Sequence, residues 1–438
     1  MKIKLTMITN MKKVRNNMKK NRTLVLVILS LIAGMAYLTP LIRFSFYDQM
    51  KEAMQLTDVQ IGSIGAIYGV FNVACYVPSG ILAEKFNTKK LLIISTFALC
   101  LVTIWYSFYP GFQMLLVIHA LYGVFSVGTF WSPYLNAIRH LGSEEEQGRI
   151  FGISEGLRGI GQTVVAFGCL AVMGLFASTA MGFRSLLWIN AVVFFLLMLA
   201  VIFFVPDFDK EDAADSENKK SVSKETKEKK KGENALLKTI TSPSTWICIF
   251  VILCGYTVWN TVNGYIGTYC TRVLNIPAGI SSTLSIVRSY IIVFAAGLTG
   301  GFFIDRFKAK GSGMMIVFLS TGICTAGVFL THNLIFLCVG VTIILSYLVN
   351  VIKSTYWSIL GDAGVPLHMT GIATGVISLI GLTPDIFVAP VVSRFIAWGE
   401  SAGNLEAGFN LMLVWLFVWS ILGVGASFIL KLKKEKVR

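Results

Sequence analysis

The stretch GILAEKFNTKK at residues 80–90 returns in altered form as GFFIDRFKAK at residues 301–310. In each copy a glycine is followed four residues later by an acid, Glu84 or Asp305, and then by a base and a phenylalanine. The copies stand 221 residues apart, and each lies in the polar gap between two long apolar segments. Small residues let helix backbones approach closely in a membrane. The repeat therefore predicts a duplicated membrane protein.

Composition supports this prediction across the whole chain. Hydrophobic residues make up 55% of the 438 residues and charged residues only 14%, whereas a soluble domain is about 25% charged. The mean hydropathy is +0.71. Crossing a bilayer takes roughly 20 apolar residues, and such segments occur six times, then after a break six times more. We expect an all-α polytopic membrane protein of 12 transmembrane helices in two pseudo-symmetric six-helix bundles, with spans near 23–46, 59–82, 90–109, 112–138, 149–177, 184–206, 245–270, 280–304, 313–331, 334–359, 371–397 and 405–430.

The break between the two sets of segments, residues 207–243, holds nine acids and nine bases and almost nothing apolar. Such a segment buries too little apolar surface to offset its ordering entropy, so we predict a disordered, charged cytoplasmic linker. The expected domain order is a basic tail at 1–22, a six-helix bundle at 23–206, this linker, a second bundle at 244–430 and a basic tail at 431–438.

The lysines and arginines predict the orientation in the membrane. In the twelve-helix arrangement 30 of the 38 fall on one side, together with both termini and the linker. Cytoplasmic loops carry this excess, so we expect both termini in the cytoplasm of a plasma membrane, the inner membrane of a bacterium. The formal net charge of +15 is this topology signal and does not indicate a nucleic-acid partner. All eight cysteines lie in apolar segments, which predicts reduced thiols.

The repeat extends weakly beyond the two loops, because TFWS at 129–132 parallels TYWS at 355–358. Over residues 23–430 the chain resembles the major facilitator superfamily, whose loop motif between helices 2 and 3 is Gly-x-x-x-Asp-Arg-x-Gly followed by two basic residues. The resemblance implies two parallel six-helix repeats with a substrate cavity between them near the bilayer midplane. It also implies alternating access by rocking of one half against the other.

The chain departs from the family motif at three positions. Glu84 replaces the aspartate, Lys85 the arginine and Asn87 the second glycine, whereas Asp305 and Arg306 keep the usual pair in the second copy. The resemblance implies that Glu84 and Asp305 act as gate latches that dock on a helix of the opposite half, and hence as conformational residues. The alternative interpretation is a capped turn with solvated charges.

Six ionisable residues fall inside the apolar segments, where charge is costly and usually marks a pathway or a pair. Four are bases and two are acids, so an enclosed cavity lined by them favours an anionic ligand. Arginine adds a planar fork that fits carboxylate, sulfonate or phosphate oxygens. The six residues are Arg43, Glu155, Arg158, Arg288, Lys353 and Asp385.

Glu155 and Arg158 are three residues apart, which places them on one face of a helix. We predict that Arg158 binds substrate and that Glu155 titrates a proton or gates; a purely structural ion pair is the alternative. Arg43 resembles in placement the helix 1 arginine that organic-anion exchangers of the superfamily use for substrate. The alternative interpretation is that its side chain reaches the outer lipid headgroups. Those proteins pair it with a helix 7 arginine that is missing here, and Arg288 is the predicted substitute. Asp385, which follows a proline, is predicted to pair with a base or to carry a proton.

Aromatic and amide side chains in the apolar segments predict the rest of the substrate pocket. Such residues provide apolar walls and hydrogen bonds in small-molecule sites, although many in any bundle serve only packing. The predicted substrate contacts among them are Tyr37, Trp131, Tyr265, Trp357 and Asn263.

These features predict a secondary active transporter that moves a small, anionic organic solute by alternating access, driven by a proton gradient or by exchange. A neutral sugar or nucleoside symporter and a drug or metabolite efflux antiporter are the alternatives. The four histidines are scattered and no Walker motif is present, so we expect neither an enzyme nor ATP as the energy source. The expected partners are the solute, a coupling ion and the lipid bilayer. We expect a monomer that uses no cofactor and no metal.

Overall fold

The computed structural model describes residues 22–142, 146–208, 241–364 and 370–436, and every regular element in these ranges is helical. Eleven helices of this part of the chain are long and apolar enough to span a membrane. They become twelve when the bent pair Arg22–Leu38 and Arg43–Met54 is counted as one span. The predicted all-α, twelve-span architecture is therefore confirmed. The predicted N-terminal tail up to residue 21 and the predicted linker between 209 and 240 lie outside the described residues.

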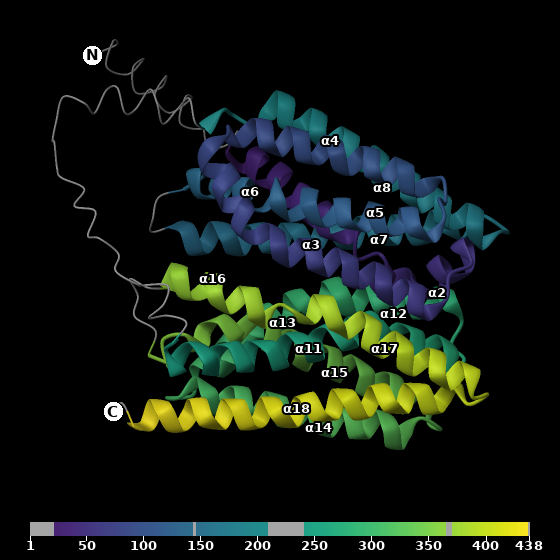
Figure 1. Ribbon diagram of the computed structural model, residues 1–438, viewed down its shortest axis with the longest axis vertical. Coiled ribbons are helices and arrows are strands. Elements are labelled where there is room, and N and C mark those ends of the chain that lie inside the picture. The colour runs from purple at the N-terminus through teal and green to yellow at the C-terminus, as the bar shows by residue number, and fades with distance from the viewer. Residues whose placement is uncertain (1–21, 143–145, 209–240, 365–369, 437–438) are drawn as a thin grey trace, which may run out of the picture.

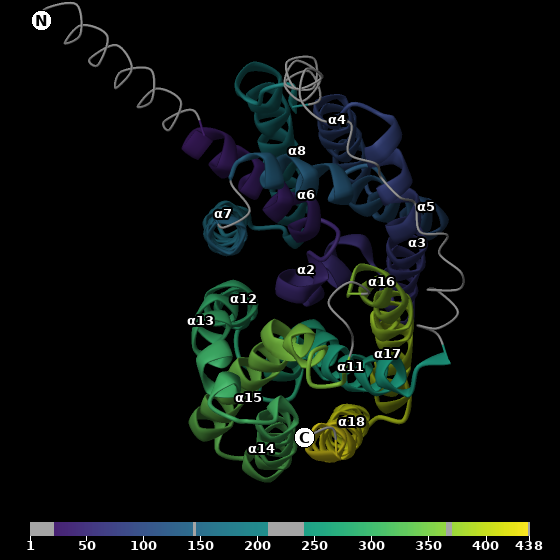
Figure 2. The same cartoon turned by 90° about the vertical axis from the view of Figure 1, so that its left-hand side faces the viewer.

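The first six spans form one layer of the molecule, coloured purple to teal in Figures 1 and 2. The fourth span passes through a short π-helical segment, η1, between two α-helices. The elements after the helix Arg22–Leu38 are α2 (Arg43–Met54), α3 (Asp58–Lys85), α4 (Thr88–Ser107), α5 (Phe112–Gly123), η1 (Val124–Gly128), α6 (Trp131–His140), α7 (Gln147–Met173) and α8 (Thr179–Phe204).

The last six spans form the second layer, coloured green to yellow. Two of these spans are again interrupted, one by a π-helical segment and one by a break before a proline. The elements are α11 (Pro243–Arg272), α12 (Ala278–Ile286), η3 (Val287–Ile291), α13 (Ile292–Asp305), α14 (Lys310–Thr331), α15 (Ile335–Thr355), η4 (Tyr356–Ile359), α16 (Thr370–Gly381), α17 (Pro384–Ser401) and α18 (Leu405–Lys436).

Three of the predicted intramembrane charges lie at irregular points of these helices. Arg43 opens α2 after a 46° bend, Arg288 lies within η3, and Asp385 is the second residue of α17. Proline lacks the N–H that a helix interior requires, which accounts for the breaks at Pro40 and Pro384. Irregular backbone at membrane depth is tolerated only where protein or a cavity covers it. These breaks therefore direct attention to the interior of the molecule.

The two layers meet closely where α3 crosses α17, at three glycines of α3. A Cβ atom added at Gly62 would lie 2.1 Å from Ser393 Oγ, and one at Gly69 would lie 2.2 Å from the backbone oxygen of Asp385. Gly65, between them, faces Ala389. Only residues without a side chain permit this approach, so the glycines fix the position of one half against the other.

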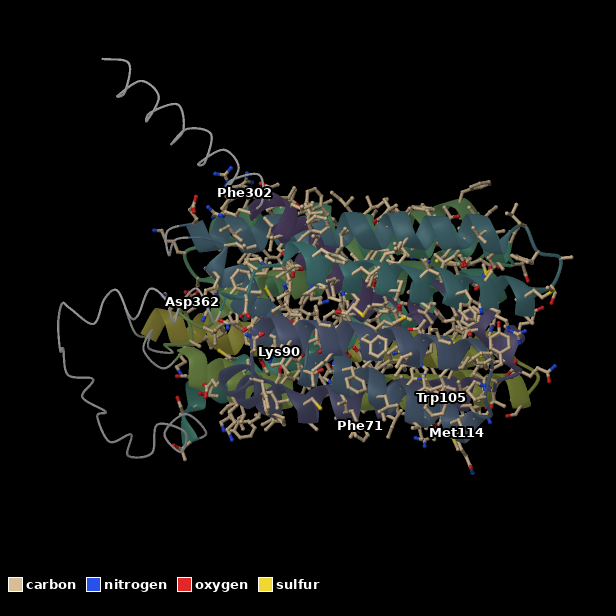
Figure 3. All side chains as sticks on the ribbon, turned by 90° about the horizontal axis from the view of Figure 1, so that it is seen from above. Phe71, Lys90, Trp105, Met114, Phe302 and Asp362 are labelled. Atoms are coloured by element: carbon tan, nitrogen blue, oxygen red, sulfur yellow. The ribbon has the colours of Figure 1, made fainter. Side chains whose placement is uncertain are left out.

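The loop signature is a helix-to-helix turn at one end of the bundle. Asn87, which replaces the family glycine, caps α4 by accepting a hydrogen bond from the Lys90 backbone N–H at 2.9 Å. In Figure 3, Lys90 and Asp362 lie nearer this end, and Trp105 and Met114 lie nearer the opposite end. Phe302 lies between Gly301 and Asp305 of the second copy and is 77% exposed on the outer wall of the bundle. Such apolar exposure is expected for a wall that faces lipid.

Candidate functional site

Arg43 is buried between the two halves of the molecule. Its side chain is only 4% exposed, and its guanidinium carbon lies 4.7 Å from the Phe44 ring centre and 6.0 Å from that of Tyr265 on α11. Neither Nε nor Nη1 finds a hydrogen-bond acceptor within the described part of the chain. In this structure Arg43 therefore does not reach outward to headgroups, and its donors remain available inside the bundle.

Asp385 lies at the same crossing of α3 and α17 and accepts hydrogen bonds from both halves. Asn260 Nδ2 donates to Oδ1 at 2.7 Å, and the Tyr256 hydroxyl donates to Oδ2 at 3.0 Å. Asn72 Nδ2, which comes from α3 in the first half, donates to Oδ2 at 3.2 Å. The charge of Arg43 lies within electrostatic range of the carboxylate. The break at Pro384 thus places an acid among three donors.

Lys353 brings a second base to this region from α15. Its ammonium lies 3.4 Å from the centre of the Trp259 ring on α11, a close cation–π contact that holds the charge against an aromatic face. Its charge interacts with that of Asp385 in its own half and with those of Glu155 and Arg158 in the other half. Lys353 therefore lies where the charges of the two halves meet.

Glu155 and Arg158 lie on one face of α7, as their spacing predicts, and form an ion pair there. Arg158 Nη1 donates to Glu155 Oε1 at 2.9 Å. The guanidinium carbon of Arg158 lies 5.8 Å from the Tyr37 ring centre, and the Tyr37 ring meets the Trp131 ring edge-on at 5.7 Å. Tyr37, Trp131, Arg158 and Glu155 thus form one aromatic and charged cluster in the first half.

Arg288 occupies a separate buried position. It is 3% exposed, and its Nη2 donates to Ser285 Oγ at 3.0 Å while Nη1 lies 3.8 Å from Cys270 Sγ. Among the described residues these hydrogen-bond partners come from α11 and α12, and none is another of the predicted site residues.

The remaining predicted contacts of the second half are engaged by the protein itself. Asn263 Nδ2 donates to the Trp259 backbone oxygen at 2.9 Å, and the Tyr265 hydroxyl donates to the Ala389 backbone oxygen at 2.9 Å. Trp357 packs edge-on against Tyr356 at 5.5 Å in η4. These contacts engage the Asn263 amide nitrogen and the Tyr265 hydroxyl, and Tyr265 is 0% exposed in this state.

Five charged residues that sequence reasoning did not select join the two halves at the end opposite the loop signature. We call them the Asp58 cluster. Arg272 of α11 binds Asp58 with both Nη atoms, at 3.0 and 3.1 Å, and binds Asp48 through Nε at 2.7 Å. Lys51 Nζ lies 2.7 Å from Asp58 Oδ2 and 3.1 Å from Glu400 Oε1 on α17. Asp58 itself is 1% exposed.

Within the described part of the chain, the two signature acids make no ion pair across the halves. Glu84 is exposed, and Asp305 pairs with Lys310 of its own half at 3.3 Å. The docking of these acids on the opposite half remains a prediction about another conformation. The described residues also contain no group of three His, Cys, Asp or Glu side chains placed to hold a metal ion, and all eight cysteines are free thiols.

Comparison with known proteins agrees with this architecture. The sequence model of the Major Facilitator Superfamily matches residues 24–390. The inner membrane protein YqcE of Escherichia coli (strain K12) is 27% identical over 92% of this chain and 92% of its own length. The inner membrane protein YihN of the same organism is 26% identical over 91% of this chain and 93% of its own.

Solved structures show the same fold. A bacterial homolog of the human lysosomal transporter Spinster, in an inward-facing and unoccupied conformation, superposes with a TM-score of 0.75 at 15% identity, covering 95% of this chain and 98% of that one. A D-xylose-proton symporter gives a TM-score of 0.69 at 14% identity, covering 94% and 96%. At these identities the likeness is one of fold.

Proposed function

This chain belongs to the major facilitator superfamily of secondary transporters, and from that premise we propose that it carries a small organic anion across the membrane by alternating access. Transport is driven by an ion gradient, with the proton as the coupling ion, or by exchange. The proposed solute site lies between the halves, around Arg43, Lys353 and the cluster of Tyr37, Trp131 and Arg158. The chain acts as a monomer with both termini in the cytoplasm.

The observation that carries this proposal is that Nε and Nη1 of the buried Arg43 guanidinium lack a hydrogen-bond partner among the described residues. A buried charge without hydrogen-bond partners is costly, and guanidinium offers five donors in a fixed fork. Here two of the three nitrogens have no acceptor within the described residues, although the side chain is 4% exposed. A carboxylate, sulfonate or phosphate group supplies the missing acceptors and the missing charge together.

The surrounding charges also favour a negatively charged ligand. Arg43, Arg158 and Lys353 contribute three positive charges to the region, and Glu155 and Asp385 contribute two negative ones. Glu155 is already paired with Arg158, and Asp385 is held by three neutral donors. One positive charge therefore remains uncompensated, which favours a monoanionic group in a site of low polarity.

A neutral, polyhydroxylated solute is the second candidate, and the amides near Asp385 favour it. The Oδ1 atoms of Asn72 and Asn260 are buried and have no donor within the described residues. Hydroxyl groups of a sugar or nucleoside are suitable donors for such oxygens. A neutral solute brings no negative charge to Arg43, so we place this candidate second.

Matched solutes separate the two candidates in a thermal-shift assay on the purified protein. Gluconate, glucuronate and glucose 6-phosphate are compared with glucose, which resembles them without the anionic group, and uridine is included as a neutral nucleoside. We expect at least one anion to raise the unfolding temperature and its neutral counterpart to leave it unchanged. If only the neutral solutes stabilise the protein, the second candidate replaces the first.

Arginine variants locate the binding group in the same assay. A lost charged hydrogen bond costs about 1.5–3 kcal/mol, so Arg43→Gln should weaken anion binding by about tenfold or more, and Arg43→Lys should restore it only in part because lysine lacks the fork. Arg184→Gln is the matched control, since Arg184 is an exposed arginine stacked on Tyr109 at 4.7 Å in the first half. Equal anion binding by Arg43→Gln and wild type contradicts the proposal.

A further inference from the structure

The Asp385 carboxylate only accepts hydrogen bonds among the described residues. Each of its described partners, Asn260, Tyr256 and Asn72, is a donor, at 2.7, 3.0 and 3.2 Å. An ionised carboxylate only accepts hydrogen bonds, so this arrangement suits the charged form. A protonated carboxyl has a hydroxyl that must donate, and it therefore requires an acceptor nearby.

Two suitable acceptors lie on the same side chains that now donate. Asn72 Oδ1 and Asn260 Oδ1 are buried and lack a donor in the part of the chain that the structure describes. When an amide group turns by about 180°, its oxygen and nitrogen exchange places. Each asparagine can thus present an oxygen to Asp385 in place of its N–H. The site is able to satisfy either protonation state by rotation of one amide.

We propose that Asp385 is the proton-coupling site, where one proton from water adds to Oδ1 and the new hydroxyl donates to Asn260 Oδ1 after the Asn260 amide turns. Oδ1 is favoured because Asn260 is its one described donor, whereas Oδ2 holds both Tyr256 and Asn72. The proton neutralises the carboxylate, and its return to water restores the charge. This inference rests on the proposed function, because it names the ion that drives anion transport.

The charges that face Asp385 link the proton to the anion. Arg43 on α2 and Lys353 on α15 are positive and stabilise the carboxylate. An anion bound beside them offsets this attraction and makes protonation easier. By linkage, the proton in turn strengthens anion binding. Among the described residues, tyrosines on α3, α11 and η4 also lie within electrostatic range, namely Tyr68, Tyr76, Tyr256 and Tyr356. The expected mode is symport of a proton with the anion.

Asn72 links the proton to the conformational cycle. It lies on α3 in the first half, whereas Asp385 lies on α17 in the second. When α3 and α17 separate, the carboxylate loses one of its three donors, and loss of a hydrogen bond to the charged form favours protonation. We therefore expect the proton to bind in the state where the two helices are apart and to leave in the state described here.

The proton itself is the probe that tests this site, so no substrate is needed. The purified protein is titrated from roughly pH 9 to pH 5, a range in which buried carboxyl groups titrate, and the infrared carbonyl band of a protonated carboxyl group is followed. We expect a band that grows on acidification and is lost in Asp385→Asn. Asp385→Glu should retain a titrating band at a changed frequency, which keeps the test valid if Asp385→Asn does not fold.

Two further variants separate the roles of the amides. Asn260→Leu should shift the frequency of the band, because the protonated carboxyl loses its acceptor. Asn72→Leu removes a donor that stabilises the ionised form more than the protonated form, so the band should develop about one pH unit higher than in wild type. Glu406→Gln, which changes a half-exposed carboxylate that lies near His332, is the control and should leave the band intact.

Several results overturn the inference. They are a band that persists in full in Asp385→Asn, a band that is lost in Glu155→Gln instead, and a wild-type protein without any band. A band that is unaltered in Asn260→Leu also overturns the inference, since the amide oxygen then serves another group such as a solute hydroxyl. The thermal-shift comparison is independent of these results. If no anion binds while the Asp385 band titrates, the proposed substrate class fails and the proton site stands.

Discussion

The two ends of the molecule are joined in different ways. At the end that holds the Asp58 cluster, Arg272 and Glu400 of the second half bind three residues of the first half through ion pairs of 2.7–3.1 Å. At the end that holds the loop signature, the ion pairs of the described residues each stay within one half. Arg22 pairs with Glu146, Asp305 with Lys310 and Lys434 with Asp362.

This difference identifies the conformation. A transporter that works by alternating access seals one end at a time, and charge pairs across the halves belong to the sealed end. The structure is therefore closed at the Asp58 cluster, and no ion pair of the described residues joins the signature acids Glu84 and Asp305 to the opposite half. With the orientation that the lysines and arginines predict, the closed end faces outward and the signature end faces the cytoplasm.

The largest effect expected from this comparison follows removal of Arg272. Its guanidinium is the link between two carboxylates of the first half, and Asp58 has a side chain that is 0% exposed. Breaking a buried ion pair by removal of one partner typically costs about 3–5 kcal/mol. We expect Arg272→Ala to lower the thermal unfolding midpoint strongly and to open this end. A cysteine at Gln49, which now donates to Ser282 across the halves at 2.8 Å, should then react with a membrane-impermeant maleimide.

The matched control for this prediction is Arg184→Ala, which removes an exposed arginine whose ring partner, Tyr109, lies in the same half. Labelling at position 49 should stay low in this variant. Cys75 and Cys324, the two partly exposed native thiols, are replaced by serine in all samples. If Arg272→Ala leaves both the midpoint and the labelling unchanged, the Asp58 cluster does not seal this end.

The sequence predicts the fold well because apolar length and the charge of the loops are local properties. The breaks at Pro40 and Pro384 follow from proline chemistry, and the structure has both. The π-helical segment around Arg288 carries no comparable signal, since no proline or glycine lies within Val287–Ile291. It depends on packing between helices, which a single sequence does not specify.

The site is less predictable, because it depends on how the helices are rotated and joined. The spacing of Glu155 and Arg158 predicts their common helix face, where the structure has the ion pair of the alternative interpretation. The burial of Arg43 and the donors around Asp385 require knowledge of which faces of α3 and α11 meet α17. Asp58 and Arg272 escape notice because an acid at a helix start and a base at a helix end are ordinary complements of the helix dipole. Only the fold shows that these two residues bind each other.

The second prediction compares two glycines of α3, which runs from the Asp58 cluster to the loop signature. A Cβ atom at Gly69 would collide with the Asp385 backbone, whereas one at Gly80 has nothing within 4 Å. Overpacking of this kind costs about 1–3 kcal/mol, so Gly69→Ala should lower the unfolding midpoint. Gly80→Ala is the control and should keep or slightly raise it, since alanine favours a helix. Equal midpoints for the two variants would show that α3 and α17 are not in contact.

The third prediction concerns the exposed edge of the Asp58 cluster. Glu400 is 52% exposed and binds only Lys51 among the described residues. Exposed ion pairs contribute about 0.2–1 kcal/mol, so Glu400→Gln should destabilise the protein far less than Arg272→Ala. High salt screens such a pair, and the midpoint difference from wild type should therefore shrink as salt is added. A loss as large as that of Arg272→Ala would mean that the cluster acts as one unit rather than as a buried core with an exposed edge.

The smallest effect on stability is expected at the opposite end of the molecule, in Glu84→Gln. Glu84 is exposed and makes no ion pair within the described residues, so the substitution should change the stability by no more than about 0.5 kcal/mol. Its proposed role belongs to the other conformation, in which this end closes and the acid docks on the second half. Removing the charge should then slow the conversion between the two states and reduce the transport rate of the anion found by thermal shift, while its binding affinity in detergent stays as in wild type. Asp305→Asn should act in the same direction, because it is the symmetric copy. A large loss of affinity with an unchanged rate would place Glu84 in the solute site and would end the assignment of the signature to the closing of this end.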